Sequence, residues 1–198
     1  MTPHPEPSPD FGTALWRMLV RAAMRAYLLT LGGLTRFGPA TRQPPGTQHV
    51  LLTGTFHSDN WIRAHLGPLA AARSCGRITM VATTPVPSVD KVVAVYPPRW
   101  LRRLIGEIPA RLLTFAVVAV HSRPDVVGGF HLLINGLVAL LMARLTGARA
   151  WYFCVGGLTE LRDGGVWGEN RYFARLRTPD AAVERALLRA VSSFDLVV

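Results

Sequence analysis

Lysine is nearly absent from this sequence, because Lys91 is the only lysine among 22 lysine and arginine residues. The net charge of +10 therefore comes almost wholly from arginine, and it favours polyanions such as nucleic acid, anionic lipid headgroups or phosphorylated ligands. The arginines are scattered, few aromatic residues lie among them, and no nucleic-acid-binding motif is present. We therefore expect an anionic membrane surface or a phosphate-bearing ligand as partner, and no nucleic acid.

Cysteine is also scarce. The two cysteines, Cys75 and Cys154, lie far apart and match no metal-ligand spacing, so we expect no metal site. Both have apolar or small neighbours, which is typical of buried free thiols in a reducing compartment. The chain has no Walker loop and no Gly-x-Gly-x-x-Gly fingerprint, which disfavours a nucleoside-triphosphate site and an oxidoreductase-type dinucleotide site.

Long hydrophobic runs are missing as well. No stretch reaches the roughly 18 uncharged apolar residues that a transmembrane helix needs. The best candidate, 112–120, is too short and follows Pro109 and Arg111. The first ten residues carry Glu6 and Asp10 and no basic start, unlike a secretory signal. We therefore expect a cytoplasmic protein, and attachment to the inner face of the membrane stays open.

One predicted helix near the start of the chain carries a row of arginines. Residues 11–31 have helical character, and Arg17, Arg21 and Arg25 are spaced by four, so they form one narrow stripe on an otherwise apolar helix. This pattern is typical of a helix that lies in a membrane interface with its cations toward the headgroups. It is equally typical of a helix that packs on the domain and leaves one arginine edge in solvent.

The regions around this helix complete the domain plan. Residues 1–10 hold four prolines and no periodicity, which predicts a disordered tail. Gly32 and Gly33 are predicted to end the helix, and the Pro/Gly-rich run 38–46 to act as a linker. The helix and linker together occupy residues 11–47.

From residue 48 onward, predicted strands alternate with predicted helices. The strands are expected at 49–53, 77–83, 91–95, 125–128, 150–155 and 194–198. The helices are expected at 61–74, 97–122 with a break near Pro109, 132–145 and 179–192. Such an alternation implies βαβ units, and the apolar strands indicate a sheet covered on both faces. The sequence therefore predicts an α/β fold: a Rossmann-like three-layer domain over residues 48–198 with a mostly parallel sheet. Because the last predicted strand stops at Val198, we expect the native polypeptide to continue.

Polar side chains follow the first predicted strand. In an open parallel sheet, ligands bind outside the carboxyl ends of the strands. The loop 54–60 places His57, Asp59 and Asn60 just before a helix N-terminus, where anions and polar ligands bind well. One of Ser58, Asp59 and Asn60 is expected to cap the helix. Beside this capping role, contact of His57 or Asp59 with a ligand is the functional alternative.

A second group follows the strand at 125–128. Gly128 and Gly129 lead to His131, and a histidine at a strand end can act as an acid or base, or bind a hydroxyl or a phosphate. Asn135 lies one helical turn further on. The alternatives are a structural histidine and a polar interruption in the helix.

A third group follows the strand at 150–155. Gly156 and Gly157 either let the backbone approach a ligand closely or simply form a turn. Glu160 lies just beyond, and Glu169 is separated from it by a glycine-rich loop. The distance between the Glu160 and Glu169 carboxylates does not follow from the sequence, so the sequence does not establish a mechanism with paired carboxylates.

Several of these features resemble the N-terminal domain of family-4 glycosyltransferases. They are the strand-end His131, the lead-in at 123–127, the helix start at 135–139, the glycine pair Gly156-Gly157 and the closing segment 194–198. That family consists of GT-B enzymes, in which two Rossmann-like domains face each other across a cleft. The resemblance covers roughly residues 48–198, and the tail and first helix lie outside it.

The resemblance implies a function and a set of roles. In the family the N-terminal domain mainly holds the acceptor, the C-terminal domain binds the nucleotide-sugar donor, and transfer retains the anomeric configuration, usually without a metal. It implies that His131 lies near the transferred sugar and that Gly156 and Gly157 lie beside the cleft. This chain departs from the family at 54–60, where a glycine-rich turn is common, so the identity of the acceptor stays open.

We therefore expect the acceptor half of a retaining, nucleotide-sugar-dependent glycosyltransferase of the hexosyltransferase type. Its catalytic residue would be His131, and its substrate-binding residues would be His57, Asp59, Asn60, Asn135, Gly156, Gly157 and Glu160. The partners would be the nucleotide-sugar donor, as co-substrate, and a sugar or lipid-linked acceptor, with no further cofactor. The isolated 198 residues are expected to be inactive. The alternative is a non-catalytic α/β module that binds anionic membrane lipid through its first helix.

Overall fold

The computed structural model describes residues 11–42, 46–55, 58–155, 176 and 178–198. The described strands are β1 (Gln48–Thr53), β2 (Cys75–Val81), β3 (Val92–Val95), β4 (Val126–Phe130), β5 (Arg149–Phe153) and β6 (Leu196–Val197). The described helices are α1 (Phe11–Phe37), α2 (Asp59–Ala71), α3 (Arg99–Ile105), α4 (Glu107–Ser122), α5 (Leu137–Thr146) and α8 (Ala181–Val191), and a π-type turn, η1 (Leu132–Gly136), precedes α5.

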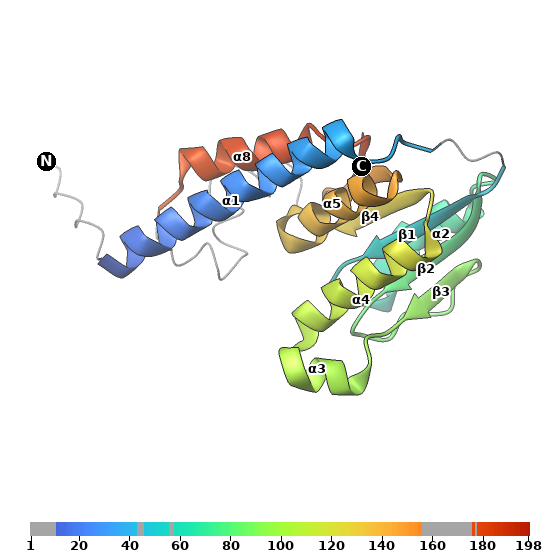
Figure 1. Cartoon of the computed structure of the whole chain (residues 1–198). Helices are drawn as coiled ribbons and strands as arrows, with labels where there is room; N and C mark the ends of the chain where they lie inside the picture. The colour runs from blue at the N-terminus through green and yellow to red at the C-terminus, as the bar shows by residue number, and fades with distance from the viewer. Residues whose placement is uncertain (1–10, 43–45, 56–57, 156–175, 177) are drawn as a thin grey trace, which may run out of the picture.

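The six strands form one sheet in the order β3-β2-β1-β4-β5-β6, and every pair of neighbours is parallel. Helices flank this sheet, so the chain has the predicted α/β, Rossmann-like three-layer arrangement with an N-terminal helix (Figure 1). The sheet itself is wholly parallel. None of the described helices combines the length and the apolar character needed to cross a bilayer.

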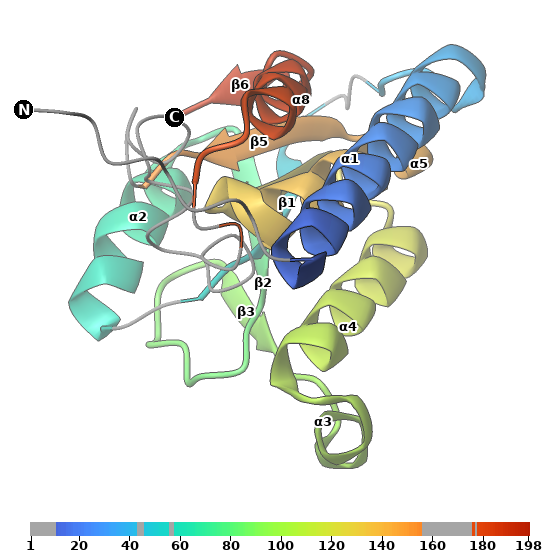
Figure 2. The same cartoon turned by 90° about the vertical axis from the view of Figure 1, so that its left-hand side faces the viewer.

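Both faces of the sheet are covered, which explains why its central strands are continuously apolar. Leu51 and Leu52 of β1 point to opposite faces, and both are fully buried. Leu51 packs in the cluster formed with Phe115 of α4 and Leu140 of α5, whereas Leu52 packs in the cluster formed with α2. Figure 2 shows this division, with α2 on one side of the sheet and α1, α4 and α5 on the other.

The strand order creates a switch point between β1 and β4. The chain leaves β1 through α2 toward β2, and it leaves β4 through α5 toward β5 on the other side. The loops after β1 and β4 therefore diverge from two neighbouring strands. In doubly wound sheets this is the place where ligands bind.

The first helix is longer than predicted, because α1 continues through Gly32 and Gly33 to Phe37. A glycine in a helix interior costs about 1 kcal/mol relative to alanine. Packing offsets that cost, since Leu31 is buried and Leu28 packs against the same cluster as α5. The helix instead ends at Gly38, whose backbone N–H donates to Leu34 O at 2.8 Å.

The predicted helix over 97–122 is two helices, and the break lies at Gly106 rather than near Pro109. Gly106 has φ 87°, a conformation that glycine adopts at little cost. Its N–H donates to Arg102 O, and its carbonyl accepts from Ala110 N. Pro109 lies in the first turn of α4, where a missing N–H breaks no helical hydrogen bond.

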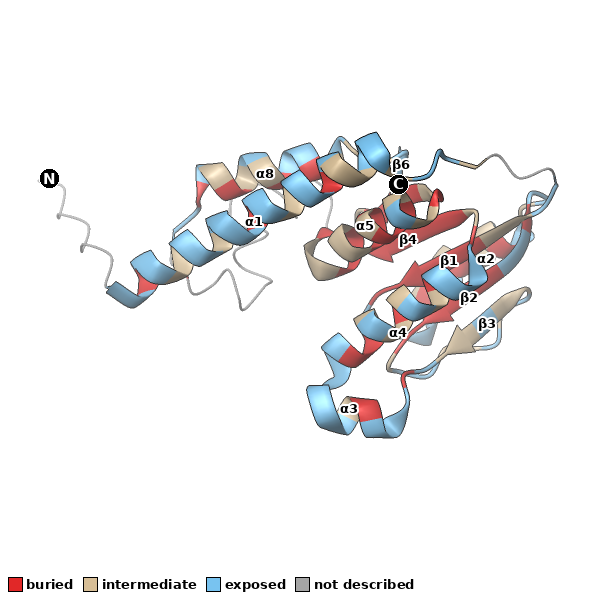
Figure 3. Cartoon of the chain, viewed as in Figure 1, coloured by how far each residue is buried: buried red, intermediate tan, exposed pale blue. Residues whose placement is uncertain are grey.

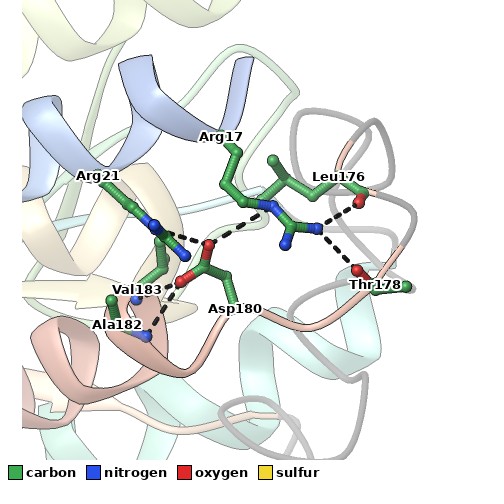
Figure 4. A network of polar contacts seen from close by, with 7 residues as sticks. All are labelled: Arg17, Arg21, Leu176, Thr178, Asp180, Ala182 and Val183. Atoms are coloured by element: carbon green, nitrogen blue, oxygen red, sulfur yellow. Dashed lines mark hydrogen bonds and ion pairs between the residues drawn. The ribbon is translucent and has the colours of Figure 1, made fainter. Parts of the chain in front are cut away.

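Helix α1 lies beside α8, and a buried carboxylate joins them (Figures 1 and 4). The fully buried side chain of Asp180 caps α8 by accepting from the amides of Ala182 at 3.0 Å and Val183 at 3.3 Å. It also pairs with Arg21 Nε at 2.9 Å and with Arg17 Nε at 3.6 Å. Two of the three stripe arginines thus pair with the residue that caps α8, and the third, Arg25, is exposed.

The charge state of Asp180 follows from these contacts. Burial alone would raise the pKa of this carboxyl, but hydrogen bonds from Arg21 and from the amides of Val183 and Ala182 outweigh it and hold the pKa below its ordinary value. The anion is therefore the stable form in the fold. It ties the N-terminal helix to the Rossmann-like layers.

Candidate functional site

The candidate site is a group of five residues at the switch point, called the switch-point cluster: Thr55, Arg111, Phe130, His131 and Asn135. Thr55 follows β1, Phe130 ends β4, and His131 and Asn135 belong to the turn that leads into α5. Arg111 reaches this edge of the sheet from the start of α4. Three segments that are distant in sequence therefore meet here.

Arg111 connects the two loops. Its side chain is buried, since the residue is only 2% exposed. Nη1 donates to Gly54 O and to Thr55 Oγ1, the latter at 3.0 Å, and Nη2 donates to Asn135 Oδ1 at 2.7 Å. Asn135 in turn donates from Nδ2 to Phe130 O at 2.8 Å. This chain of hydrogen bonds fixes the loop after β1 against the turn after β4.

Within the described part of the chain, nothing compensates the positive charge of the cluster. There, Arg111 forms no ion pair with a carboxylate, its partners are neutral oxygens, and its buried Nε has no acceptor. Burial lowers the pKa of the Arg111 guanidinium to about 10, which still leaves it charged at neutral pH. A buried cation in a low dielectric favours ligands that bring negative charge or oxygen lone pairs to this edge.

His131 occupies a strained backbone conformation. Its φ is 63° and its ψ is 136°, values that residues with a side chain rarely adopt. The geometry is held from both sides, since His131 N donates to Phe153 O and His131 O accepts from Gly136 N. Ile134 also has a positive φ, of 67°. A strained backbone conformation persists only where surrounding contacts hold it in place, and such conformations are found preferentially at functional sites.

The turn can reach the strand because Gly129 lacks a side chain. A Cβ on Gly129 would lie 2.6 Å from the carbonyl carbon of Asn135 and 2.7 Å from its oxygen. This close backbone approach lets the Asn135 side chain return to Phe130 O. The predicted helix over 132–145 therefore begins as η1, and a regular α-helix starts only at Leu137.

The first predicted loop is only partly described. Ser58 caps α2, because its Oγ accepts from Trp61 N at 3.3 Å, so the predicted capping role falls to this residue. Asp59 and Asn60 are exposed in the first turn. Within the described residues, neither side chain hydrogen-bonds to the switch-point cluster. The structure thus brings His131 and Asn135 together and leaves Asp59 and Asn60 on the neighbouring helix start.

Five candidates that the sequence analysis named lie outside the described residues. They are His57, Gly156, Gly157, Glu160 and Glu169.

Aromatic rings surround Phe130. Trp61 of α2 stacks on His65 with ring centroids 3.9 Å apart, and Phe130 meets Trp61 edge-on at 5.2 Å. Phe130 also stacks on Phe153 of β5 at 4.4 Å. Polar groups that converge beside apolar and aromatic side chains are typical of small-molecule sites.

The part of the chain that the structure describes contains no group of three or more His, Cys, Asp or Glu side chains that could hold a metal ion. Cys75 is buried and Cys154 is partly buried, and both are free thiols. Burial raises the pKa of the Cys75 thiol, which disfavours the reactive thiolate.

Arg111 is the site residue that sequence reasoning missed. A signal was present, because Arg111 shares one helix face with Phe115 and Ala119 at spacings of four, and both of these are buried. An arginine on the apolar face of a helix needs buried partners, and here they are the two strand-end loops.

Comparison of the chain with protein-family models, with curated proteins and with solved structures finds no match.

Proposed function

We propose that this chain is the acceptor-binding domain of a retaining, nucleotide-sugar-dependent glycosyltransferase of the hexosyltransferase type. The observation that carries the proposal is the switch-point cluster: a buried guanidinium, without a carboxylate partner among the described residues, that fixes two strand-end loops beside a strained histidine. The cluster lies at the sheet edge where doubly wound folds bind ligands. His131 and Asn135, which carry part of the resemblance to family-4 glycosyltransferases, are both in it.

Each residue has a distinct role in this proposal. His131 contacts the reacting sugar, because an imidazole can donate a hydrogen bond to a hydroxyl or accept one from it. Asn135 is already committed to Arg111 and to Phe130 O, so it is a positioning residue. Asp59 and Asn60 are exposed at the start of α2 and would contact the acceptor. His57, Gly156, Gly157 and Glu160 keep their proposed substrate-binding roles.

The proposed reaction balances without a further cofactor. The bond between the anomeric carbon and the diphosphate breaks, and a bond to the acceptor oxygen forms on the same face of the sugar. The acceptor's hydroxyl proton leaves with the nucleoside diphosphate. The positive charge of Arg111 favours negative charge near this edge, on the donor or on the acceptor. Such an enzyme would work in the cytoplasm, free or at the inner face of the membrane.

Sugar transfer by the complete gene product tests this proposal. Labelled nucleotide hexoses are offered with soluble saccharides and with lipid-linked acceptors. We expect transfer, and we expect His131→Ala to lower kcat/KM by roughly 100-fold or more, the range for a positioned acid or base. His121→Ala is the matched control, because His121 is exposed in the last turn of α4. Absence of transfer, or equal loss in both variants, would contradict the proposal.

A second candidate function is favoured by the outer face of α1. The exposed apolar side chains of this helix recur at helical spacings and therefore lie on one side of it. They are Phe11, Leu15, Met18, Leu19, Leu29 and Phe37. Arg25 and Arg36 are exposed beside them, and Figure 3 shows the outward face of α1 open to solvent. This arrangement supports a non-catalytic module that binds anionic lipid through α1.

Flotation with anionic liposomes separates the two functions. Met18→Glu is used rather than deletion of α1, because α1 packs against α8 and contributes to the core. Salt-sensitive flotation that Met18→Glu abolishes, without sugar transfer by the complete gene product, supports the lipid module. Sugar transfer supports the enzyme.

A further inference from the structure

A second exposed apolar surface lies at the junction of α3 and α4. Here it is called the α3 surface, and it consists of Arg99, Trp100, Arg103, Leu104, Ile105 and Ile108. Trp100 is 65% exposed and Leu104 is 73% exposed, while Ile105 and Ile108 are also exposed. Leu101 is the one residue of α3 that is buried. This region therefore presents several large apolar side chains to solvent, and exposed apolar side chains that gather in one region mark an interaction site.

The charges on this surface are almost all positive. Residues 99–108 contain three arginines and one glutamate, a net charge of +2. The glutamate is Glu107, and it lies 3.7 Å from Arg102 in an ion pair. Arg99 and Arg103 are exposed, and neither has an acidic partner among the described residues. Exposed arginines that alternate with apolar side chains, one of them a tryptophan, are typical of a surface that enters the headgroup region of a bilayer.

Charge also argues against a second copy of this chain as the occupant. Docking the α3 surface on its twin would bring two like-charged surfaces together, which costs free energy. An anionic bilayer instead supplies the complementary charge for the arginines near the surface. It also accepts the apolar side chains.

The position of the α3 surface connects it with the switch-point cluster. Ile108 precedes Arg111 by one helical turn at the start of α4, and Arg111 holds the loops after β1 and β4. Figures 1 and 2 both show α3 projecting from the end of α4, away from the body of the domain. In Figure 1 it lies toward the end to which the strand arrows point, as does the N-terminal end of α1.

We propose that the α3 surface docks on an anionic phospholipid bilayer and so turns the switch-point cluster toward an acceptor carried at the membrane surface. The second half of this statement rests on the proposed transferase function. The docking itself rests on the exposure and charge of residues 99–108. It adds a contact that is independent of the outer face of α1.

Vesicle co-sedimentation of the complete gene product tests the docking. We expect binding to phosphatidylcholine vesicles that contain about 30% phosphatidylglycerol, weaker binding to pure phosphatidylcholine, and release when salt rises above about 0.5 M. Leu104→Glu should lower the partition coefficient at least tenfold, whereas Leu188→Glu, a matched change at an exposed leucine of α8, should leave it unchanged. Both side chains are exposed, so circular dichroism and Tm should match the parent protein.

Two further variants sharpen the readout. The double variant Arg99→Gln, Arg103→Gln should bind more weakly and lose most of its salt dependence. Trp100→Phe should remove part of the tryptophan quenching by brominated lipids. The inference is overturned if the parent protein does not bind anionic vesicles, if Leu104→Glu binds as well as the parent, or if Leu104→Glu abolishes self-association in the absence of vesicles.

Failure of this inference is distinguishable from failure of the proposed function. Sugar transfer to a soluble acceptor requires no vesicles, so transfer without vesicle binding overturns the docking and leaves the transferase standing. Vesicle binding that depends on Leu104, without any transfer, supports the docking and overturns the transferase. Met18→Glu in the same assay separates the contribution of α1 from that of the α3 surface.

Discussion

Arg111 holds together the loop after β1 and the turn after β4, and its partners Gly54 and Asn135 lie 57 and 24 residues from it in the sequence. Taking its charge out of water costs several kcal/mol, and no carboxylate among the described residues compensates it. Hydrogen bonds to Gly54, Thr55 and Asn135 offset part of that cost. A buried aliphatic side chain would fill the same space without this desolvation cost. The retained charge is therefore consistent with a role in binding.

Arg111→Met should destabilise the fold. It leaves Gly54 O and Asn135 Oδ1 buried without their donor, and each unsatisfied group costs about 1–3 kcal/mol. We expect the free energy of unfolding, measured with urea, to fall by roughly 2–4 kcal/mol. The control is Arg103→Met on the exposed side of α3, which should change it by less than about 0.5 kcal/mol. Equal stability of the two variants would contradict the connecting role of Arg111.

Gly129→Ala tests the backbone contact beneath His131. The new methyl group would lie 2.6 Å from the Asn135 backbone, which has no flexible side chain to move away, so η1 must shift. We expect a loss of about 1–3 kcal/mol in unfolding free energy, as for other overpacked sites. Gly67→Ala is the control, because nothing lies within 4 Å of the new Cβ in α2, and it should stabilise by up to about 1 kcal/mol. A Gly129→Ala protein as stable as the parent would refute the tight packing of η1 on β4.

At the scale of elements, one carboxylate contributes to the pairing of α1 with α8 beside their apolar packing, and this contribution depends on pH. The pKa of Asp180 is held below its ordinary value of 3.8 in the folded state. The stabilisation is thus fully present above the ordinary pKa, and it is lost as pH falls through the lower folded pKa. Acid should loosen α1 from the domain.

Asp180→Asn isolates this contribution. Arg21 is partly exposed, so solvent screens the pair, and we expect a loss of about 1–3 kcal/mol in unfolding free energy at neutral pH. The difference between parent and variant should shrink as pH falls below about 4. Glu107→Gln, at an exposed ion pair, should differ from the parent by less than about 0.5 kcal/mol throughout. A difference that stays constant down to the acid transition would contradict the ionic role of Asp180.

Element types could be predicted from local sequence, but several of their limits could not. The buried apolar runs predict the strands, and the observed strand ends differ from the predicted ones by at most two residues. Gly32 and Gly33 are predicted to end α1, yet packing of Leu31 against the core keeps the helix intact. The η1 turn was not predictable, because it depends on the close contact between Gly129 and Asn135. Contacts between segments decided each of these cases.

At the scale of the whole molecule, the α/β class and parallel sheet were predictable from the alternation of strands and helices. The strand order β3-β2-β1-β4-β5-β6 was not, because it depends on which distant strands pair. For the same reason the sequence indicated His131 and Asn135, which are neighbours in the chain, and missed Arg111. The guanidinium meets its hydrogen-bond partners only when α4 packs against the ends of β1 and β4.

We propose that this domain holds the acceptor for a retaining sugar transfer. The most direct test is the anomeric configuration of the product formed by the complete gene product, read from the anomeric proton coupling in NMR. We predict a product with the same configuration as the nucleotide-sugar donor, and a large loss of its formation in His131→Ala. A product of inverted configuration, or no glycoside with any nucleotide hexose, would contradict the account.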